Sequence, residues 1–188
     1  MIFQPDTRHT LGLITRHLRP EHALMDVGCG SGDVAHHLQR LGYPAIFAAD
    51  RGDFRRHPLH RFALYDGVQL PFQSNGVDMV SLNFVLHHVP NERKPVLLAE
   101  AARVSRRHLF ILEDTPIHAV DRWLSQRHGE NYRRKINSKA DFGFYDHAQW
   151  LALFQSMGLE VVEAQPLSRF CRNWLQPFAR SFFLLKAG

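Results

Sequence analysis

The feature that most constrains the fold is the stretch Leu24–Asp33, which reads LMDVGCGSGD. Leu24, Met25 and Val27 form a short apolar run typical of a buried strand, and three alternating glycines follow it. Glycine has no Cβ, so it adopts positive φ readily and lets a ligand approach the backbone. From Asp33 onward the apolar residues recur at helical spacing. The stretch therefore predicts a strand, a glycine turn open to a ligand, and a helix.

The spacing of these glycines disfavours a nicotinamide cofactor. The common dinucleotide fingerprint has a third glycine three residues after the second. Asp33 occupies that position here, and the glycines follow the pattern Gly28-x-Gly30-x-Gly32. A carboxylate at the start of the helix would repel a pyrophosphate, whereas it is compatible with a cationic ligand. A nicotinamide oxidoreductase is therefore a poor alternative.

Composition sets broad limits on the protein. A chain of 188 residues is one domain by length and large enough to bury a core. Its two cysteines, Cys29 and Cys171, give no disulfide framework and favour a reducing compartment, so we expect a cytoplasmic location. No apolar run reaches the roughly 18 residues of a membrane span. The histidines lack companion cysteines and a His-Glu-x-x-His motif, so no metal site is predicted.

The charge pattern permits an acidic partner without requiring one. The formal net charge is +5, with basic clusters at residues 51–61 and 133–139. A basic cluster is more often a solvated face than a binding surface. Nucleic acid is therefore possible as a partner but not favoured.

Apolar runs alternate with helical patterns along much of the chain. A helix is predicted within residues 1–20, a second over 33–41, and a third from Asn91, its plausible cap, to Val104. Strands are predicted at residues 23–27, 45–50, 62–66, 77–83 and 109–114. Strands and helices alternating at short spacing indicate an α/β fold with a doubly wound parallel sheet.

Polar residues stand at the carboxyl ends of these predicted strands. In chain order the strands end at Gly28, Asp50, Asp66, Asn83 and Asp114, and all of these except the glycine are polar. A doubly wound sheet binds its ligand beyond the carboxyl ends, where the strand order reverses. Each polar residue alone could be a loop cap, but together they predict one polar rim.

These motifs resemble class I S-adenosylmethionine-dependent methyltransferases, with the methyltransferase type 11 group as the nearest pattern. The resemblance rests on DVGCGSG at residues 26–32, Asp50, Asp66 before Leu70-Pro71-Phe72, the stretch FQSNGVDMV at 72–80, and NFVLHH at 83–88. It implies a Rossmann-like, seven-stranded, mostly parallel sheet with an antiparallel C-terminal strand pair. Residues 159–164 and 181–186 fit that pair, and a helix is predicted over residues 147–157.

The resemblance also implies a cofactor site for S-adenosylmethionine. Asp26 would help to hold the methionine end, Asp50 would accept from both ribose hydroxyls, and Asp66 would face the adenine amino group. An acidic rim independently suits the sulfonium cation. The candidate cofactor-binding residues are Asp26, Gly28, Cys29, Gly30, Gly32, Asp50, Arg51, Asp66, Gly67, Asn83 and Phe84. For Cys29 between its glycines, packing is the alternative role.

His87 and Asp114 are the candidate catalytic residues. His87 and His88 would point about 100° apart on a helical turn, so at most one of them faces the pocket. Glu113 and Asp114 alternate faces in the same way on a strand. A base helps only when the acceptor must lose a proton, and positioning alone can suffice for methyl transfer.

We expect a single domain over residues 1–188. It divides into an N-terminal helix at 1–20, a cofactor-binding half at 21–115, a substrate lid insertion at 116–146, and a C-terminal helix and strand pair at 147–188. The lid aromatics that would contact the acceptor are Trp123, Tyr132, Phe142, Phe144 and Tyr145. A satellite core beneath a long loop is the alternative role for them.

The predicted activity is methyl transfer from S-adenosylmethionine to a small-molecule acceptor. A methyltransferase acting on RNA or protein is one alternative, and a catalytically silent cofactor-binding scaffold is another. The stretch after Asn83 reads Phe-Val-Leu rather than Pro-Pro-Tyr, which argues mildly against methylation of base amino groups. The acceptor atom and the oligomeric state stay open.

Overall fold

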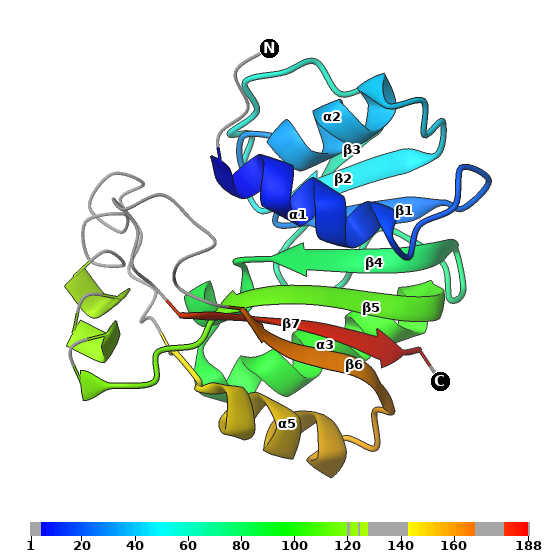
Figure 1. Ribbon diagram of the computed structural model, residues 1–188. Coiled ribbons are helices and arrows are strands. Elements are labelled where there is room, and N and C mark those ends of the chain that lie inside the picture. Colours follow the sequence, from blue (N-terminus) through cyan, green and yellow to red (C-terminus); the bar gives the residue numbers. More distant parts are fainter. Residues whose placement is uncertain (1–4, 120, 124, 128–142, 168–178, 188) are drawn as a thin grey trace.

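One seven-stranded sheet forms the centre of the protein. Figure 1 shows the computed structural model, which describes residues 5–119, 121–123, 125–127, 143–167 and 179–187. The strands are β1 (Leu24–Val27), β2 (Ile46–Asp50), β3 (Phe62–Leu64), β4 (Val77–Asn83), β5 (Ser105–Asp114), β6 (Val161–Leu167) and β7 (Arg180–Lys186). Their order is β3-β2-β1-β4-β5-β7-β6. β1 to β5 run parallel, whereas β7 runs antiparallel to both β5 and β6. The predicted fold class is confirmed.

Helices cover both faces of this sheet. They are α1 (Pro5–Thr15), α2 (Asp33–Arg40), α3 (Lys94–Val104) and α5 (His147–Ser156), with short 3-10 turns η1 (Leu86–His88) and η2 (Asn91–Arg93). Neighbouring residues of a strand point to opposite faces. In β5, Leu109 and Ile111 pack with α3 and α5, whereas Phe110 and Leu112 pack with α1 and α2. Figure 1 shows α1 in front of the sheet and α3 behind it. Strands covered on both faces read as continuous apolar runs.

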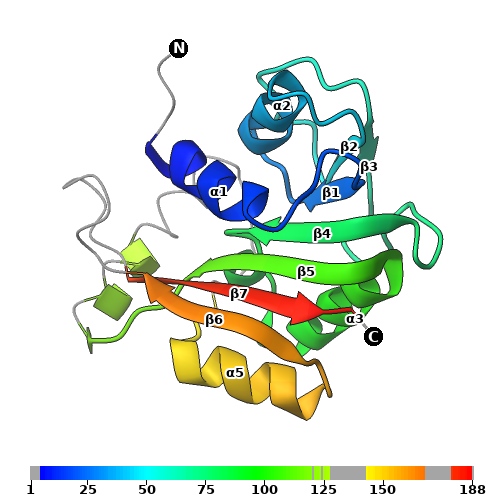
Figure 2. The same ribbon diagram turned by 45° about the vertical axis from the view of Figure 1, so that its right-hand side comes forward.

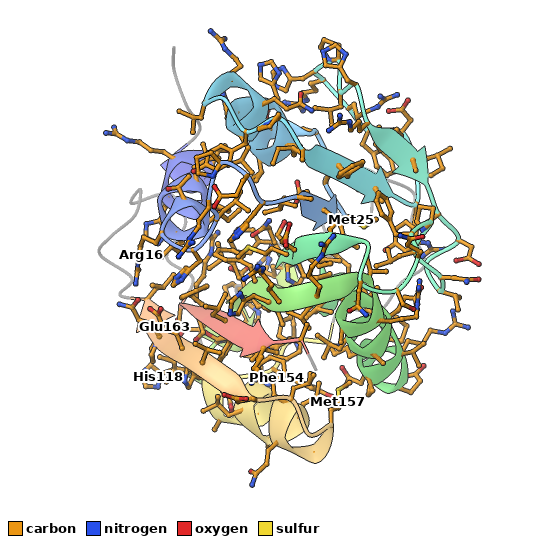
Figure 3. The ribbon with its side chains drawn as sticks, turned by 90° about the vertical axis from the view of Figure 1, so that its right-hand side faces the viewer. Arg16, Met25, His118, Phe154, Met157 and Glu163 are labelled. Atoms are coloured by element: carbon orange, nitrogen blue, oxygen red, sulfur yellow. The ribbon has the colours of Figure 1, made fainter. Side chains whose placement is uncertain are left out.

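The end of α1 is tied to the outer strand of the sheet. Figure 3 shows Arg16, the residue after α1, beside Glu163 on β6, and Arg16 Nη2 donates to Glu163 Oε1 at 2.9 Å. The pair is partly exposed, so it contributes at most about 1 kcal/mol. It joins the first helix to a strand that comes almost last in the sequence.

Three strands differ from the prediction by two or more residues at one or both ends, and β3 is the shortest because it ends at Leu64 rather than at Asp66. β5 begins at Ser105, four residues earlier than expected. The exposed Arg106 and Arg107 interrupt the apolar run from which the strand was predicted, so the prediction missed its first residues. β6 runs to Leu167 and includes Pro166, which an outer strand tolerates because one edge has no ladder partner.

The predicted helix start at Asn91 is wrong. Residues 91–93 form η2, and α3 begins at Lys94 without a side-chain cap. The Asn91 Oδ1 atom instead accepts from Lys94 Nζ at 2.5 Å. Lys94 is fully buried and also donates to Val89 O at 2.8 Å, so the Asn91 side chain satisfies a buried cation rather than the helix end. Burial lowers the pKa of Lys94 to about 8.

The half of the sheet that holds β2 and β3 is covered sparsely. Residues 51–61 and 65–76 connect β2, β3 and β4 without any helix. Phe54, Leu64 and Val68 are each about half exposed there. None of the described helices is long and apolar enough to cross a membrane.

Candidate functional site

The candidate site lies where the strand order reverses, between β1 and β4. The order runs from β1 through β2 to β3 on one side, and from β4 to β5 on the other. Gly28 follows β1, Asp50 ends β2 and Asn83 ends β4. The structure therefore brings these three predicted residues to the carboxyl edge at the switch point, where open α/β sheets bind ligands.

The glycine turn after β1 is shaped by one close contact. Gly28 has φ +68°, and a Cβ added there would lie 2.5 Å from Val85 Cγ2. Gly30 has φ +51°, and a Cβ there would meet nothing within 4 Å. At Gly32 the added Cβ would lie 3.0 Å from Leu59 Cδ1. Gly28 and Gly32 thus allow packing, whereas Gly30 borders open space that a ligand can enter.

Asp50 connects the end of β2 to this turn. Its Oδ2 atom accepts from Gly30 N at 2.8 Å, and its Oδ1 atom accepts from Arg51 N at 2.7 Å. A Cβ on Gly67 would lie 2.9 Å from Arg51 Nε, so the Arg51 side chain lies against the Gly67 turn. One half-buried carboxylate therefore fixes two loops of the site.

Asp26 is buried inside β1 and is held by β4. The register places it opposite Ser81, and its Oδ1 atom accepts from Ser81 Oγ at 2.9 Å and from Asn83 Nδ2 at 3.1 Å. Burial raises the pKa of Asp26 to about 6, and the nearby Asp50 carboxylate adds to the rise. The Asn83 Oδ1 atom is buried and accepts no hydrogen bond from the described residues. The site thus holds a buried carboxylate with a raised pKa and an acceptor without a donor, both of which suit a cationic donor.

The far side of the site is formed after β3. Asp66 is exposed, and its Oδ1 atom accepts from Val68 N at 2.8 Å and Gln69 N at 2.9 Å. These hydrogen bonds lower the pKa of Asp66, so the carboxylate is ionised. An open surface depression here is lined by residues between Asp66 and Gln73.

Tyr65 lies next to Asp50 and is a candidate site residue that the sequence analysis missed. It follows β3, and its backbone N–H donates to Asp50 O at 3.1 Å. Burial raises its pKa to about 12, with the Asp50 charge as the next contribution. An aromatic residue directly before a polar strand end is the signal that could have identified it.

Asp114 is paired with a residue of the antiparallel strand. The register of β5 and β7 places Arg180 opposite Asp114, and Arg180 Nε donates to Asp114 Oδ1 at 2.6 Å. The Arg180 guanidinium also lies 4.0 Å from the centre of the Phe84 ring. Phe84 has φ +57°, a backbone conformation that aromatic residues rarely adopt. Asp114 therefore orients Arg180, and Arg180 covers Phe84.

Glu113 fixes the loop that follows β4. It is fully buried, and its Oε1 atom accepts from Val85 N at 2.8 Å and Leu86 N at 2.6 Å. Its Oε2 atom lies 2.6 Å from His87 Nδ1. Burial alone lowers the pKa of His87, but the Glu113 carboxylate outweighs it, and the pKa of His87 is raised. His87 is thus held as a hydrogen-bond donor to Glu113, while His88 is less buried.

The described lid aromatics have different surroundings. Phe144 is buried and stacks on His87, with ring centroids 5.0 Å apart. Tyr145 lies 5.0 Å from the Trp150 ring, whereas Trp123 is 53% exposed. Tyr132 and Phe142 lie outside the described residues. Contact of these aromatics with an acceptor stays a prediction.

Cys29 and the histidines add no reactive centre in the described part of the chain. Burial raises the pKa of the Cys29 thiol, and the Asp26 and Asp50 carboxylates raise it further, so the thiol stays protonated. Among residues the structure describes, no three His, Cys, Asp or Glu side chains are grouped to hold a metal ion.

The sheet order, the glycine turn and the polar strand ends together define a class I methyltransferase architecture. A sequence model described as a methyltransferase domain matches residues 6–164. The chain therefore belongs to the methyltransferase domain family, and the resemblance stated from its motifs is confirmed. No curated protein sequence matches it.

Solved structures with the same fold share little sequence with the chain. A Haloferax volcanii protein in complex with the methyltransferase activator Trm112 is 17% identical, with TM-score 0.71, and the match covers 97% of this chain and 88% of that one. Synechocystis magnesium protoporphyrin IX methyltransferase with bound S-adenosylhomocysteine is 14% identical, with TM-score 0.66 and coverage of 97% and 82%. Burkholderia thailandensis 1,6-didemethyltoxoflavin-N1-methyltransferase, solved with that acceptor and S-adenosylhomocysteine, is 13% identical, with TM-score 0.71 and coverage of 97% and 78%.

Replacing Gly28 by alanine is expected to destabilise the protein more than replacing Gly30. Both substitutions place an L residue at positive φ, at a cost of about 1 kcal/mol. Gly28→Ala also drives its Cβ into Val85, which adds about 1–3 kcal/mol, whereas Gly30→Ala meets nothing. Urea unfolding of both variants measures the difference. An equal loss in the two would show that the Gly28–Val85 contact does not shape the turn.

The raised pKa of Asp26 is expected to make stability fall as pH rises. The folded chain releases the proton near pH 6, whereas the unfolded chain releases it near pH 4. The folded state therefore binds more protons between these values, and the free energy of unfolding falls by about 3 kcal/mol from pH 4 to above pH 6. Urea unfolding of wild type and Asp26→Asn across this range isolates the contribution. The same slope in both proteins would assign the effect to other groups.

Proposed function

We propose that this methyltransferase takes its methyl group from S-adenosylmethionine and transfers it to a small organic acceptor. One observation carries the proposal. The buried Asp26 carboxylate, the Asp50 carboxylate and the orphaned Asn83 Oδ1 meet at the switch point, beside the open space at Gly30. This is an acceptor-rich site for a molecule that carries cationic and hydroxyl donors.

The residues present fit S-adenosylmethionine. The molecule has a sulfonium and an ammonium cation, and its ammonium group would supply the donor that Asn83 Oδ1 lacks. Asp50 would accept from the ribose hydroxyls, and Asp66 and Tyr65 would lie toward the adenine. A hydrogen bond to a charged carboxylate contributes about 1.5–3 kcal/mol. The bound cofactor supplies an electrophilic methyl group, and its departure leaves a neutral thioether.

Positioning is the main task of the remaining site residues. Asp114 holds Arg180 over Phe84, and Glu113 holds His87, so both predicted catalytic residues already have a charged partner. A side chain held by a charged partner is better suited to orient neighbouring groups than to remove a proton from the methyl acceptor. We therefore assign Asp114 and His87 to shaping the acceptor side of the site. In-line displacement needs alignment above all.

Two facts support a small acceptor. The magnesium protoporphyrin IX and 1,6-didemethyltoxoflavin methyltransferases, which share the fold, are named for small-molecule acceptors. Residues 115–119, 121–123 and 125–127 lie at the end of the sheet to which β4 and β5 point, as Figures 1 and 2 show. A segment at that place can cover an acceptor, in keeping with a lid over residues 116–146 within one domain. A cytoplasmic location rests on the low cysteine content.

An acceptor on RNA or protein is the second candidate function. The basic residues between Arg51 and Arg61 favour it, because four arginines there give the loop a positive charge. Salt distinguishes the two acceptor classes, since binding to a polyanion weakens steeply as salt rises and binding to a neutral small molecule does not. A silent scaffold would bind the cofactor without methylating any acceptor.

Calorimetric titration with S-adenosylmethionine and S-adenosylhomocysteine tests the proposed site. We expect wild type to bind both and Asp50→Ala to bind them about ten- to a hundredfold more weakly, because each lost charged hydrogen bond costs about 1.5–3 kcal/mol.

Asp53→Ala is the matched control, because Asp53 lies three residues further along the same loop and pairs with Arg55 at 2.7 Å. Its affinity is expected to stay within about twofold of wild type. An equal loss of cofactor affinity in both variants would show that the cofactor does not bind at the Asp50 carboxylate. No binding by folded wild type would refute the methyltransferase proposal.

A further inference from the structure

A cavity lies away from the candidate cofactor site. Its volume is about 550 Å³, and its lining includes Arg40, Arg61, His36, His60, Tyr43 and Pro58. None of the described residues that line it is an aspartate or a glutamate. Its lining therefore differs in charge from the acidic rim at the carboxyl edge.

Chain direction places this cavity at the opposite edge of the sheet. α2 starts beside the glycine turn and runs back to Arg40, its last residue. Arg61 directly precedes the first residue of β3, and Pro44, also in the lining, precedes β2 by two residues. The cavity therefore lies by the amino ends of β2 and β3, so a ligand there does not occupy the proposed cofactor site.

Neither arginine of the cavity has a carboxylate partner within the part of the chain that the structure describes. Arg40 is exposed and has no hydrogen-bond or ion-pair partner among the described residues. Arg61 Nη1 donates to Pro44 O at 2.7 Å, and its guanidinium lies 5.0 Å from the Phe47 ring, so it has no carboxylate partner either. Burial lowers the pKa of His36, and the neighbouring His57, His37 and Arg40 lower it further, whereas the Asp33 carboxylate raises it.

The lining matches one kind of ligand. The guanidinium group presents parallel N–H donors whose geometry fits the oxygens of a phosphate. Tyr43 and Pro58 add apolar surface, and the volume falls in the range of small-molecule pockets, which exceeds the needs of a free phosphate ion. We propose that this cavity binds a phosphate monoester of about nucleotide size, with Arg40 and Arg61 on the phosphate and Tyr43 on the organic part.

Three probes separate the possible sources of that phosphate. Inorganic phosphate, a nucleoside 5′-monophosphate and a short single-stranded RNA are each titrated calorimetrically into the full chain at fixed salt. Arg40→Gln removes the partnerless charge, and we expect it to weaken phosphate-ester binding about tenfold.

Arg93→Gln is the matched control. Arg93 is exposed in η2, next to α3 on the other face of the sheet, and the substitution changes the net charge equally. We expect it to leave probe affinity within about twofold of wild type. Both variants should bind S-adenosylhomocysteine as wild type does, which keeps this test separate from that of the cofactor site.

The outcomes are distinct. Arg40-dependent binding of the monophosphate supports the proposal, whereas Arg40-dependent binding of RNA alone overturns it, because the phosphates within an RNA strand are diesters. Absence of binding by all three probes overturns it. Equal weakening in Arg40→Gln and Arg93→Gln also overturns it, because the attraction would then come from net charge rather than from the cavity.

Discussion

The shape of the candidate site depends on the buried carboxylate of Glu113. It accepts from the backbone of Val85 and Leu86 and from His87, and so fixes the loop after β4 in one conformation. Val85, held in this way, lies directly against Gly28 and determines the path of the glycine turn. A buried charge that loses a partner costs about 3–5 kcal/mol, so this arrangement resists displacement. Three strands, β5, β4 and β1, are thereby coupled around one carboxylate.

Polar groups along the carboxyl edge fall into two kinds. Glu113 and Asp114 have their partners within the chain, His87 and Arg180, and belong to the framework. Asn83 Oδ1 is buried without a donor, and Gly30 borders open space. Burying an acceptor without a partner is costly, and native structures rarely retain such a group without a reason. The unsatisfied groups therefore mark where a ligand completes the structure.

The sequence predicted the strands and their polar ends because both depend on local patterns. Apolar runs, glycine spacing and polar residues after each run identify the sheet and its carboxyl edge. Pairing across the antiparallel strand is not local: Asp114 and Arg180 lie 66 residues apart, and only the register of β5 and β7 brings them together. The predicted helix start at Asn91 was wrong for a similar reason. The Asn91 side chain accepts a hydrogen bond from the buried Lys94 and therefore does not cap the helix. The start of α5 at His147 was predicted correctly, and the capping box formed by Asp146 and Gln149 gives it a local cause.

A crystal structure of the protein with S-adenosylhomocysteine tests the central claim most directly. The account predicts the ribose hydroxyls at the Asp50 carboxylate, the amino group of the ligand at Asn83 Oδ1, and the ligand backbone beside Gly30. Electron density for the ligand elsewhere, with Asn83 Oδ1 still without a donor, would contradict the assignment of the carboxyl edge as the cofactor site.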